Sequence, residues 1–507
     1  MNSPVKTILG TGDTARGVVV DVECHFANSL PNIVIVGFAS KSVDEAKERI
    51  RGALASSNIR LPKKRITINL APADVPKQGS SFDLAIAAAI LCSAKLVPGH
   101  TKDAIIIGEL GLEGSVRAVR GVIGKILSAK KLGYDKFIIP DDNMSQARLI
   151  PDINLRSVKS LEEMFSILQE PDINFSLTDG RYSASKFPRD KISEDNILFE
   201  DVSGQERAKR ALLIAAAGHH NLMLNGPPGT GKSMLAKALK SILPPLTKNE
   251  MLEITHLHSL ANQNFEQIIT ERPVRAPHHT SSPVSIIGGG PSPKPGEVSL
   301  SHNGVLFLDE FPEFSRAVVE SLRQPLEDKQ ISVARAKDKI DFPADFILVA
   351  TSNPCPCGNY GTNLECTCPP SQISRYQKRI SGPVIDRIDL YIDVDEVNHS
   401  QLLQDKTRKP LSGDIRKRVK AVRDLQYARN GKLNSHLSSR ELKAHNRLTK
   451  EAEQLLNQAA RQMRLSARGY MRTVRVASTI ADLDGKDPVV PEYVSEALQY
   501  RKKAVEF

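Results

Sequence analysis

A stretch near the middle of the chain has the composition and spacing of a phosphate-binding loop. It fits the pattern G-x-x-x-x-G-K-[ST] with the residues Gly226, Pro227, Pro228, Gly229, Thr230, Gly231, Lys232 and Ser233. Glycines let successive backbone N–H groups face a β-phosphate, the lysine reaches the β and γ oxygens, and the serine hydroxyl ligates Mg²⁺. The stretch predicts ATP and Mg²⁺ as cofactors, against the alternative of a glycine-rich turn before a helix.

Two carboxylates follow an apolar run in the segment Gly304-Val-Leu-Phe-Leu-Asp-Glu310. In open α/β sheets, ligands gather at the carboxyl ends of the strands. We therefore expect Asp309 to hold the Mg²⁺ shell and Glu310 to polarise the water that attacks the γ-phosphate. The two acids could instead lie in a solvated turn, but the phosphate-binding loop upstream favours the catalytic interpretation.

Four of the six cysteines are crowded together in the order Cys355, Cys357, Cys366 and Cys368. Four thiols on a short loop suit tetrahedral Zn²⁺, and four sulfur ligands leave no open position, so such a metal would be structural. Reduced thiols or a redox pair are the alternatives, because the C-x-C spacing departs from the commoner C-x2-C knuckle.

Apolar runs that end in polar residues predict the strands that position these groups. NLMLN precedes the phosphate-binding loop, GVLFLDE carries the two acids, and DFILVATSN comes next, with helical stretches between them. This alternation predicts an α/β fold with a parallel sheet. From about Leu411 onward strand signals stop, and apolar residues three and four apart predict a small helical domain.

A separate α/β domain is expected before this core, because VVVDVE, NIVIVG, ITINLAPA and AIIIGELGL all have the pattern of strands. Residues 170 to 195 are polar and rich in turn formers, as in linkers. We therefore divide the 507 residues into a first domain (1–170), a linker (171–195), an ATPase core (196–400) with the four-cysteine loop (355–368), and a helical lid (401–507).

Charge and composition narrow the class of protein. The net charge of +11 favours a polyanionic partner, although charge alone does not decide the question. The N-terminus lacks the pattern of a secretory signal, and the longest apolar stretch, around Leu84 to Ala94, is too short to span a bilayer. We expect a cytoplasmic protein with no membrane partner.

Further motifs give the chain a resemblance to a known family. GPPGTGKS, RAPHHT, GGGPSPKPGEVSLSHNGVLFLDE, SNPCPCG and RISGPVIDRIDL resemble segments of the magnesium-chelatase-like AAA+ ATPases, specifically of the YifB/ComM competence-protein branch. The likeness extends from near Gly10 to Leu498. It implies a P-loop AAA+ core with a C-terminal helical lid. It also implies that six copies form a ring, a homohexamer, with ATP bound at the subunit interfaces.

The resemblance also implies roles for single residues. Asn353, at the end of DFILVATSN, matches sensor 1, which orients the attacking water. Arg387 in DRIDL matches the arginine finger that reaches a neighbour's γ-phosphate, and Arg468 in SARGYMRTVR matches sensor 2. The alternatives are a turn-forming role for Asn353, a salt bridge of Arg387 with Asp386 or Asp389, Arg379 as the finger, and Arg472 or Arg475 as sensor 2.

The first domain resembles the Lon-protease-like (S5-type) fold. VPKQGSSFD matches the segment that carries the Lon nucleophile and puts Ser81 in its place. The same likeness places Ile123 where the catalytic lysine would be, and Lys125 falls two residues late. A serine hydroxyl without an adjacent base is a poor nucleophile, so we expect an inactive domain without peptidase activity.

The family branch implies a DNA translocase or helicase that drives branch migration during homologous recombination of incoming DNA in natural transformation. Positive residues in expected loops agree with DNA as partner, namely Arg272, Arg275, His278, His279, Lys294, Arg335, Lys337 and Lys339. The alternatives are that these charges belong to solvated faces and that His278 and His279 are ordinary turn residues. The alternatives are a magnesium-chelatase-type subunit, although no D-x-S-x-S motif is present, and a protein-remodelling or regulatory ATPase without a DNA substrate.

Overall fold

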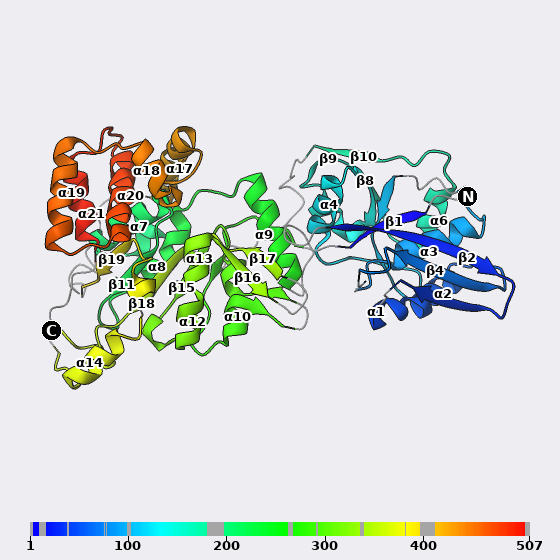
Figure 1. Cartoon of the computed structure of the whole chain (residues 1–507), viewed down its shortest axis with the longest axis horizontal. Coiled ribbons are helices and arrows are strands. Elements are labelled where there is room, and N and C mark those ends of the chain that lie inside the picture. Colours follow the sequence, from blue (N-terminus) through cyan, green and yellow to red (C-terminus); the bar gives the residue numbers. More distant parts are fainter. Residues whose placement is uncertain are drawn as a thin grey trace. The chain divides into compact units, whose positions relative to one another are not determined.

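The computed structural model describes residues 4–9, 17–37, 40–75, 77, 79–98, 103–179, 197–261, 267–290, 293–334, 339–362, 364–380, 382–395 and 411–501. The chain forms two compact units (Figure 1). The first comprises Met1–Phe187, Thr247–Thr270 and Ala334–Asp341, and the second comprises Pro188–Leu246, Glu271–Val333 and Phe342–Phe507. The first unit thus receives two segments from the middle of the chain.

An eight-stranded sheet forms the centre of the first unit, in the strand order β10-β9-β8-β5-β1-β2-β4-β3. β1, β5, β8 and β9 run parallel, whereas β2 is antiparallel to both β1 and β4. The strands are β1 Val5–Leu9, β2 Val18–Ala27, β3 Asn32–Val36, β4 Arg65–Ala71, β5 Ala104–Ile106, β8 Lys136–Pro140, β9 Pro151–Val158 and β10 Ser176–Asp179, with a separate hairpin of β6 Glu109–Leu110 and β7 Val116–Arg117.

Both faces of this sheet are buried. Successive side chains of a strand point to opposite faces, so neighbouring residues of β5 enter different hydrophobic cores. Ala104 and Ile106 belong to one hydrophobic core, and Ile105 belongs to the other. α3 is apolar from Leu84 to Cys92 and lies wholly in the first core, while α4 covers the second. The helices are α1 Lys41–Asp44, α2 Ala46–Ser56, α3 Asp83–Ser93, α4 Val122–Lys131, η1 Asp141–Asn143, α5 Met144–Ala147, α6 Leu161–Gln169 and α9 Lys248–Ala261.

The first unit extends further along the chain than the sequence predicted. β10 falls within the expected linker (171–195), yet it pairs with β9. Thr178 holds it there, since its hydroxyl donates to the carbonyl oxygen of Ile150 (2.7 Å) and accepts from the N–H of Ile153 (3.2 Å). The rest of that linker, from residue 180, lies outside the described residues.

α9 also differs from the predicted division, because it comes from the middle of the expected ATPase core (196–400) but belongs to the first unit. Its Leu252 packs against the hydrophobic core that contains Ile123 and Ile126 of α4. Local periodicity identifies such a helix but carries no information on which sheet it covers.

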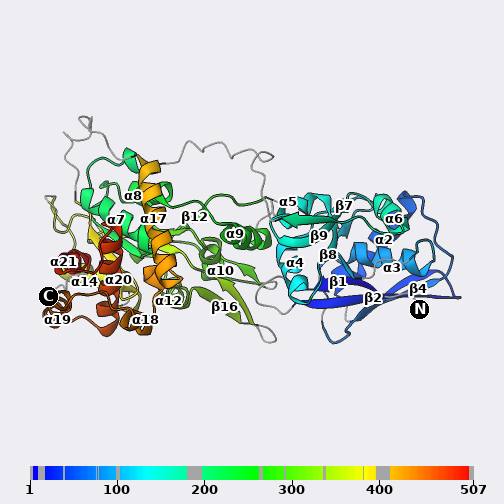
Figure 2. The same ribbon diagram turned by 90° about the horizontal axis from the view of Figure 1, so that it is seen from above.

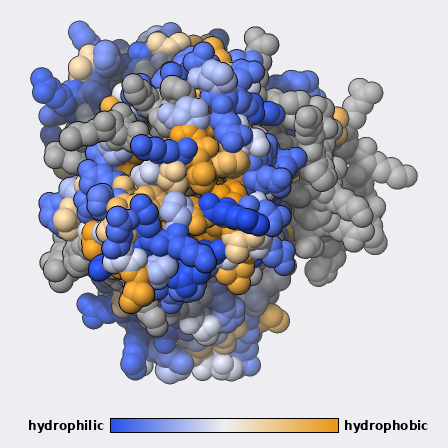
Figure 3. Space-filling model, turned by 90° about the vertical axis from the view of Figure 1, so that its right-hand side faces the viewer, coloured by the Kyte–Doolittle hydropathy of each residue, from blue (hydrophilic) through white to orange (hydrophobic). Residues whose placement is uncertain are grey.

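One face of the first unit is mainly hydrophilic, with apolar side chains gathered near the centre of the view (Figure 3). The exposed large apolar residues of the described part of this unit are Leu30, Val36, Leu96, Leu112, Leu132 and Leu177. Exposed apolar side chains are common on globular domains, and we assign this surface no function.

A five-stranded parallel sheet forms the centre of the second unit, in the order β12-β15-β18-β11-β19. The predicted strands of NLMLN, GVLFLDE and DFILVATSN are confirmed as β11, β15 and β18. The strand bounds are β11 Leu222–Asn225, β12 Val274–Arg275, β15 Val305–Leu308, β18 Ile347–Ser352 and β19 Leu390–Asp393, with short hairpins of β13 Gly288–Gly289 with β14 Lys294–Pro295 and of β16 Gln330–Ala334 with β17 Lys339–Pro343.

Helices cover both faces of this sheet. Leu306, Leu308 and Leu348 face one core, while Val305, Phe307 and Val349 face the other. The helices of this part are η3 Phe199–Asp201, α7 Glu206–Gly218, α8 Lys232–Ile242, α10 Pro283–Ile287, α11 Glu297–Leu300, η4 Phe311–Glu313, α12 Arg316–Ser321, α13 Arg323–Asp328, α14 Pro370–Gln377 and α15 Gly382–Ile385.

The helical C-terminal region is also confirmed. It consists of α17 Ser412–Asn430, η5 Asn434–His436, α18 Ser439–Ala444, α19 Lys450–Gln462, α20 Ala467–Leu483 and α21 Pro491–Gln499. α17 contacts α7 and α8, and α20 contacts α7, as Figures 1 and 2 show. Across the described ranges, no helix combines the length and apolar character that a membrane span requires.

Candidate nucleotide-binding site

The predicted phosphate-binding loop connects β11 to α8. Gly229 and Gly231 have φ angles of 82° and 83°, in the left-handed region that favours glycine. At Gly226 a Cβ atom would come within 2.3 Å of the carbonyl oxygen of Val394, so only glycine fits there too. The N–H of Gly226 donates to the carbonyl oxygen of Ser352 (3.1 Å), which fixes the loop against β18.

Lys232 is the first residue of α8 and is buried. Its Nζ donates to the carbonyl oxygens of Gly226 (2.6 Å) and Pro227 (2.7 Å) and to Oδ1 of Asn353 (3.2 Å). Burial lowers the pKa of Lys232, and the carboxylates of Asp309 and Glu310 oppose that shift. The structure thus brings the predicted P-loop lysine and the predicted sensor 1 asparagine into contact.

Asp309 lies where the Mg²⁺ shell is predicted. The hydroxyl of Ser233 donates to its Oδ2 (3.0 Å), so the two predicted Mg²⁺ ligands already touch. The hydroxyl of Thr351 donates to its Oδ1 (2.5 Å) and accepts from the N–H of Glu310 (2.9 Å). The sequence analysis missed Thr351. In the structure, the parallel register pairs Leu308 with Ala350, so the residues that follow them, Asp309 and Thr351, lie side by side.

Glu310 has a φ angle of 50°, which is unusual for a residue with a side chain. The turn leaves its carboxylate exposed just beyond the end of β15. Nδ1 of His279 lies 4.0 Å from Oε2 of Glu310. The structure therefore places His279 beside the predicted catalytic acid, whereas the sequence analysis considered it as a DNA contact or a turn residue.

The predicted arginine finger and the predicted sensor 2 residue share one carboxylate. Arg387 donates through Nη2 to Oε2 of Glu327, and Arg468 donates through Nη2 to Oε1 of the same residue (2.9 Å). Arg387 also donates to the carbonyl oxygen of Pro383 (2.6 Å) and is buried, so its salt bridge is with Glu327 rather than with a neighbouring aspartate. The arginines lower the pKa of Glu327.

The alternative arginines have other partners. Arg379 is half-exposed and donates to Oε2 of Glu313 (2.6 Å). Arg472 lies 3.5 Å from Oδ1 of Asp389, and Arg475 donates to the carbonyl oxygen of Leu437 (2.8 Å). Burial lowers the pKa of both Arg472 and Arg475. Arg468 is more than half exposed, whereas the side chains of Arg387 and Arg472 are mostly buried.

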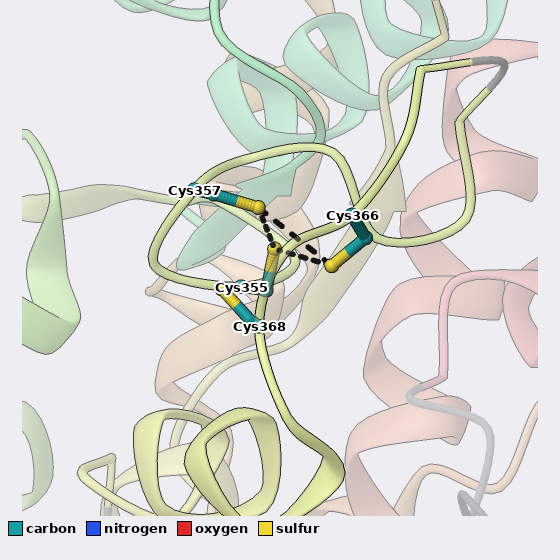
Figure 4. Close-up of side chains that lie close together, drawn as sticks. All are labelled: Cys355, Cys357, Cys366 and Cys368. Atoms are coloured by element: carbon teal, nitrogen blue, oxygen red, sulfur yellow. Dashed lines mark hydrogen bonds between the residues drawn. The ribbon is translucent and has the colours of Figure 1, made fainter.

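The four cysteines form a compact cluster (Figure 4). Sγ of Cys355 lies 3.3 Å from Sγ of Cys357 and 3.7 Å from Sγ of Cys366, and all four sulfur atoms lie within 4.8 Å of one another. Four sulfurs around Zn²⁺ at about 2.3 Å would be roughly 3.8 Å apart. Hydrogen bonding, chiefly from the N–H of Asn359, lowers the pKa of Cys357 to about 6. The donor set therefore fits Zn²⁺.

This cysteine loop (355–368) packs against the phosphate-binding loop. A Cβ atom on Gly358 would lie 2.5 Å from Cδ of Pro228, and Gly358 has a φ angle of 86°. Two residues before the first cysteine is Asn353, which contacts Lys232. A change in the cysteine cluster can therefore reach the nucleotide site by direct contact.

Two of the predicted DNA-contacting arginines are structural instead. Arg272 is buried and donates to the carbonyl oxygens of Pro244 (2.6 Å) and Asn303 (2.7 Å). Arg275 forms a bidentate pair with Glu297 at 2.5 and 2.8 Å. His278 and Lys294 are exposed, whereas Arg335, Lys337 and the side chain of Lys339 lie outside the described residues.

The Lon-like features of the first unit show no catalytic pair. Ser81 is buried, and no hydrogen bond among the described residues joins its hydroxyl to a basic side chain. Lys125 is buried in α4, and burial lowers its pKa to about 8. Lys77 donates its Nζ to the carbonyl oxygen of Pro72.

Three family models match successive parts of the chain. Residues 198–402 match the family described as magnesium chelatase, subunit ChlI, residues 22–143 match subunit ChlI of Mg-chelatase, and residues 410–501 match the ChlI C-terminal family. The chain is 42% identical over 487 residues to competence protein ComM of Haemophilus influenzae, covering 95% of this chain and 94% of that protein.

Two further relatives match different shares of the chain. Protein YifB of Escherichia coli is 39% identical over 487 residues, covering 95% of this chain and 94% of its own length. The Lon protease of Leptospira interrogans is 30% identical over 154 residues, which is 29% of this chain and 18% of that protease. The second match is therefore limited to one domain.

Proposed function

Because the chain belongs to the ComM and YifB family of magnesium-chelatase-like AAA+ proteins, we propose that it is a Mg²⁺-dependent ATPase that moves DNA. In this proposal a ring of six copies drives branch migration when incoming DNA recombines in the cytoplasm during natural transformation. The observation that carries the ATPase is the convergence of Ser233, Thr351 and Asp309 at the end of the parallel sheet, beside the contact of Lys232 with Asn353.

The side chains have complementary tasks in ATP hydrolysis. Lys232 exchanges its loop carbonyl partners for the β and γ oxygens of ATP, and Asn353 and Glu310 hold the attacking water. Ser233 and Asp309 would hold Mg²⁺, which supplies charge neutralisation at the transferring phosphate. Thr351 keeps Asp309 turned toward Ser233.

Arg387 and Arg468 lie on one face and contact a common carboxylate, so a single movement of Glu327 releases both. We assign Arg387 to the γ-phosphate bound by the neighbouring subunit, where an arginine neutralises the developing charge, and Arg468, as sensor 2, to the nucleotide. The role of Arg387 requires the ring, because it places this arginine at the nucleotide of another subunit.

The cysteine loop has a supporting role in this proposal. Cys355, Cys357, Cys366 and Cys368 bind Zn²⁺ as a closed structural site, and the metal stiffens the loop that Gly358 packs on Pro228. The domain division that accompanies this function places a Lon-like domain first, the AAA+ core with the cysteine loop second, and the helical lid last.

DNA as the substrate is supported by the relative named a competence protein and by the net charge of +11. His278 and Lys294 are exposed and available for phosphate contacts. Repeated six times around a ring, such modest contacts would add up to strong, salt-sensitive binding.

The test measures ATP turnover with and without four-way DNA at two salt concentrations, together with migration of a labelled three-strand junction. Lys232→Ala should abolish both activities, because it removes the ammonium from the phosphates. Lys237→Ala is the matched control, since Lys237 is exposed on the same helix. Turnover that ignores DNA, with no junction migration, would refute the DNA motor and favour a protein-remodelling ATPase.

A further inference from the structure

Three side chains from distant parts of the second unit meet at one point. His219 follows α7, Asp345 precedes β18, and His436 ends η5 in the helical C-terminal region. Nε2 of each histidine lies 3.2 Å from Oδ1 of Asp345, and the two rings are 5.1 Å apart. The cluster has no part in the nucleotide site or the cysteine loop.

The separations match a metal site. Ligand atoms at about 2.0–2.1 Å from a tetrahedral Zn²⁺ lie roughly 3.3 Å from one another. The two observed distances of 3.2 Å, from Nε2 of each histidine to Oδ1 of Asp345, are close to this value. The three ligand atoms all lie within 4.8 Å of one another. Two imidazole nitrogens and one carboxylate oxygen are a common donor set for Zn²⁺ and leave a fourth position for water.

The ligand atoms lack well-aligned hydrogen bonds. Nε2 of His219, Nε2 of His436 and Oδ1 of Asp345 are all buried, and their closest partners are one another, at 3.2 Å and with poor hydrogen-bond alignment. His219 is only 5% exposed. Buried polar atoms normally have partners, and an ion is one established reason for an exception. Three buried, poorly hydrogen-bonded ligand atoms that converge within 4.8 Å are a donor set that a cation fits.

The backbone around Asp345 is fixed independently of its side chain. Its N–H donates to Nδ1 of His302 (3.0 Å), and its carbonyl oxygen accepts from the N–H of Asn303 (2.6 Å). These contacts fix the backbone from which the carboxylate reaches the two histidines.

Two positive neighbours oppose metal binding, namely Arg423, whose charge acts on His219, and Lys329, which contacts Asp345. Nζ of Lys329 lies 3.4 Å from Oδ1 of Asp345 and supplies a positive charge to the same oxygen. Its side chain is 28% exposed, so the ammonium can turn into solvent when a cation binds. A cation must compete with this lysine, and that competition distinguishes a metal site from an ion pair.

We propose that His219, Asp345 and His436 bind a divalent transition-metal cation, Zn²⁺ by the chemistry of the donor set. The metal joins the end of α7 and the start of β18 to the helical C-terminal region. It is independent of the cysteine loop and of the proposed DNA function, because no residue is shared with either.

The test compares the purified full chain with His219→Ala and His436→Ala, and uses His445→Ala, an exposed histidine nearby in sequence, as control. Elemental analysis should find one fewer zinc per chain in each cluster variant than in the wild type and the control. Co²⁺ substitution separates the two sites, since only cobalt bound by cysteine gives sulfur charge-transfer absorption. Circular dichroism identifies variants that fail to fold, and His436→Asn then replaces His436→Ala.

Lys329→Met provides the second arm. If the cluster binds Zn²⁺, removing the competing ammonium should tighten Zn²⁺ binding by about tenfold, which corresponds to ~1.4 kcal/mol of relieved charge repulsion. Zn²⁺ should also raise the Tm of chelator-treated wild type more than that of His436→Ala. Equal zinc content in all variants, or a Lys329→Met protein that is less stable but binds zinc unchanged, would overturn the proposal.

Discussion

Thr351→Val is the most informative single change at the nucleotide site. Thr351 is 1% exposed, and valine has nearly the same volume, so the change removes the hydroxyl and little else. Two hydrogen bonds are lost, one to Asp309 and one from the N–H of Glu310. A hydrogen bond to a charged group contributes about 1.5–3 kcal/mol, and an unpaired buried N–H costs about 1–3 kcal/mol.

The effect on stability should be at the lower end of these values, because Asp309 is exposed and water can replace the lost donor. We expect a loss of about 1–2 kcal/mol in the free energy of unfolding. The effect on catalysis should be larger, since Asp309 would no longer be held toward Ser233. With roughly tenfold in rate for each 1.4 kcal/mol, turnover at fixed Mg²⁺ should fall about 10–100-fold.

The assay is ATP turnover as a function of Mg²⁺ concentration, with Tm measured on the same samples. Thr351→Ser keeps the hydroxyl and should restore most of the activity. Ser352→Ala is the matched control, because the hydroxyl of Ser352 donates to Oδ1 of Asn225 (3.0 Å) and not to Asp309. If Thr351→Val has the turnover and Mg²⁺ requirement of the wild type, Asp309 is positioned by other groups and this reasoning is wrong.

Three further outcomes are expected. Glu327→Gln weakens the ion pairs that Glu327 makes with Arg387 and Arg468. Because Arg387 is then freer to reach a neighbouring subunit, ATP turnover should reach its half-maximum at a lower protein concentration. Glu320→Gln should not shift this concentration. The side chain of Asp482 is fully buried, and Arg429 and Arg447 lower its pKa although burial alone would raise it. The ionised carboxylate should therefore stabilise the fold fully above about pH 4, and this stabilisation should be lost as the pH falls through the lowered pKa. Asp482→Asn should reduce the free energy of unfolding by about 3–5 kcal/mol at pH 7, as measured by denaturant unfolding. A strong zinc chelator should lower Tm and ATP turnover together, because the cysteine loop packs on Pro228; a chelated protein with unchanged turnover would show that the loop does not support the site.

The sequence was sufficient to predict the local parts of the site. The loop from Gly226 to Ser233 and the acids after β15 are contiguous motifs, so residue type and spacing identify them. The parallel sheet was also predictable, since β11, β15 and β18 are short apolar runs that end in polar residues.

Contacts between distant segments were not predictable in the same way. Thr351 and Glu327 have no distinguishing neighbours in the sequence, and their roles arise because sheet register and packing bring them to Asp309 and Arg387. Arg272 was misinterpreted for the same reason, since a positive residue in a loop looks solvated until its buried carbonyl partners are known.

The placement of α9 has a consequence for experiments that dissect the protein. The chain passes between the two units at residues 187, 246, 270, 333 and 341, so no single cut separates them. Removing residues 1–187 would leave Leu252 and the rest of α9 without the surface they cover, and a fragment that ends at 187 would lack that cover. Loss of solubility or activity on truncation would then result from the exposed apolar surface of α9 and would not reveal the function of the Lon-like domain. An internal replacement of 247–270 by a short polar loop is needed before such a truncation is informative.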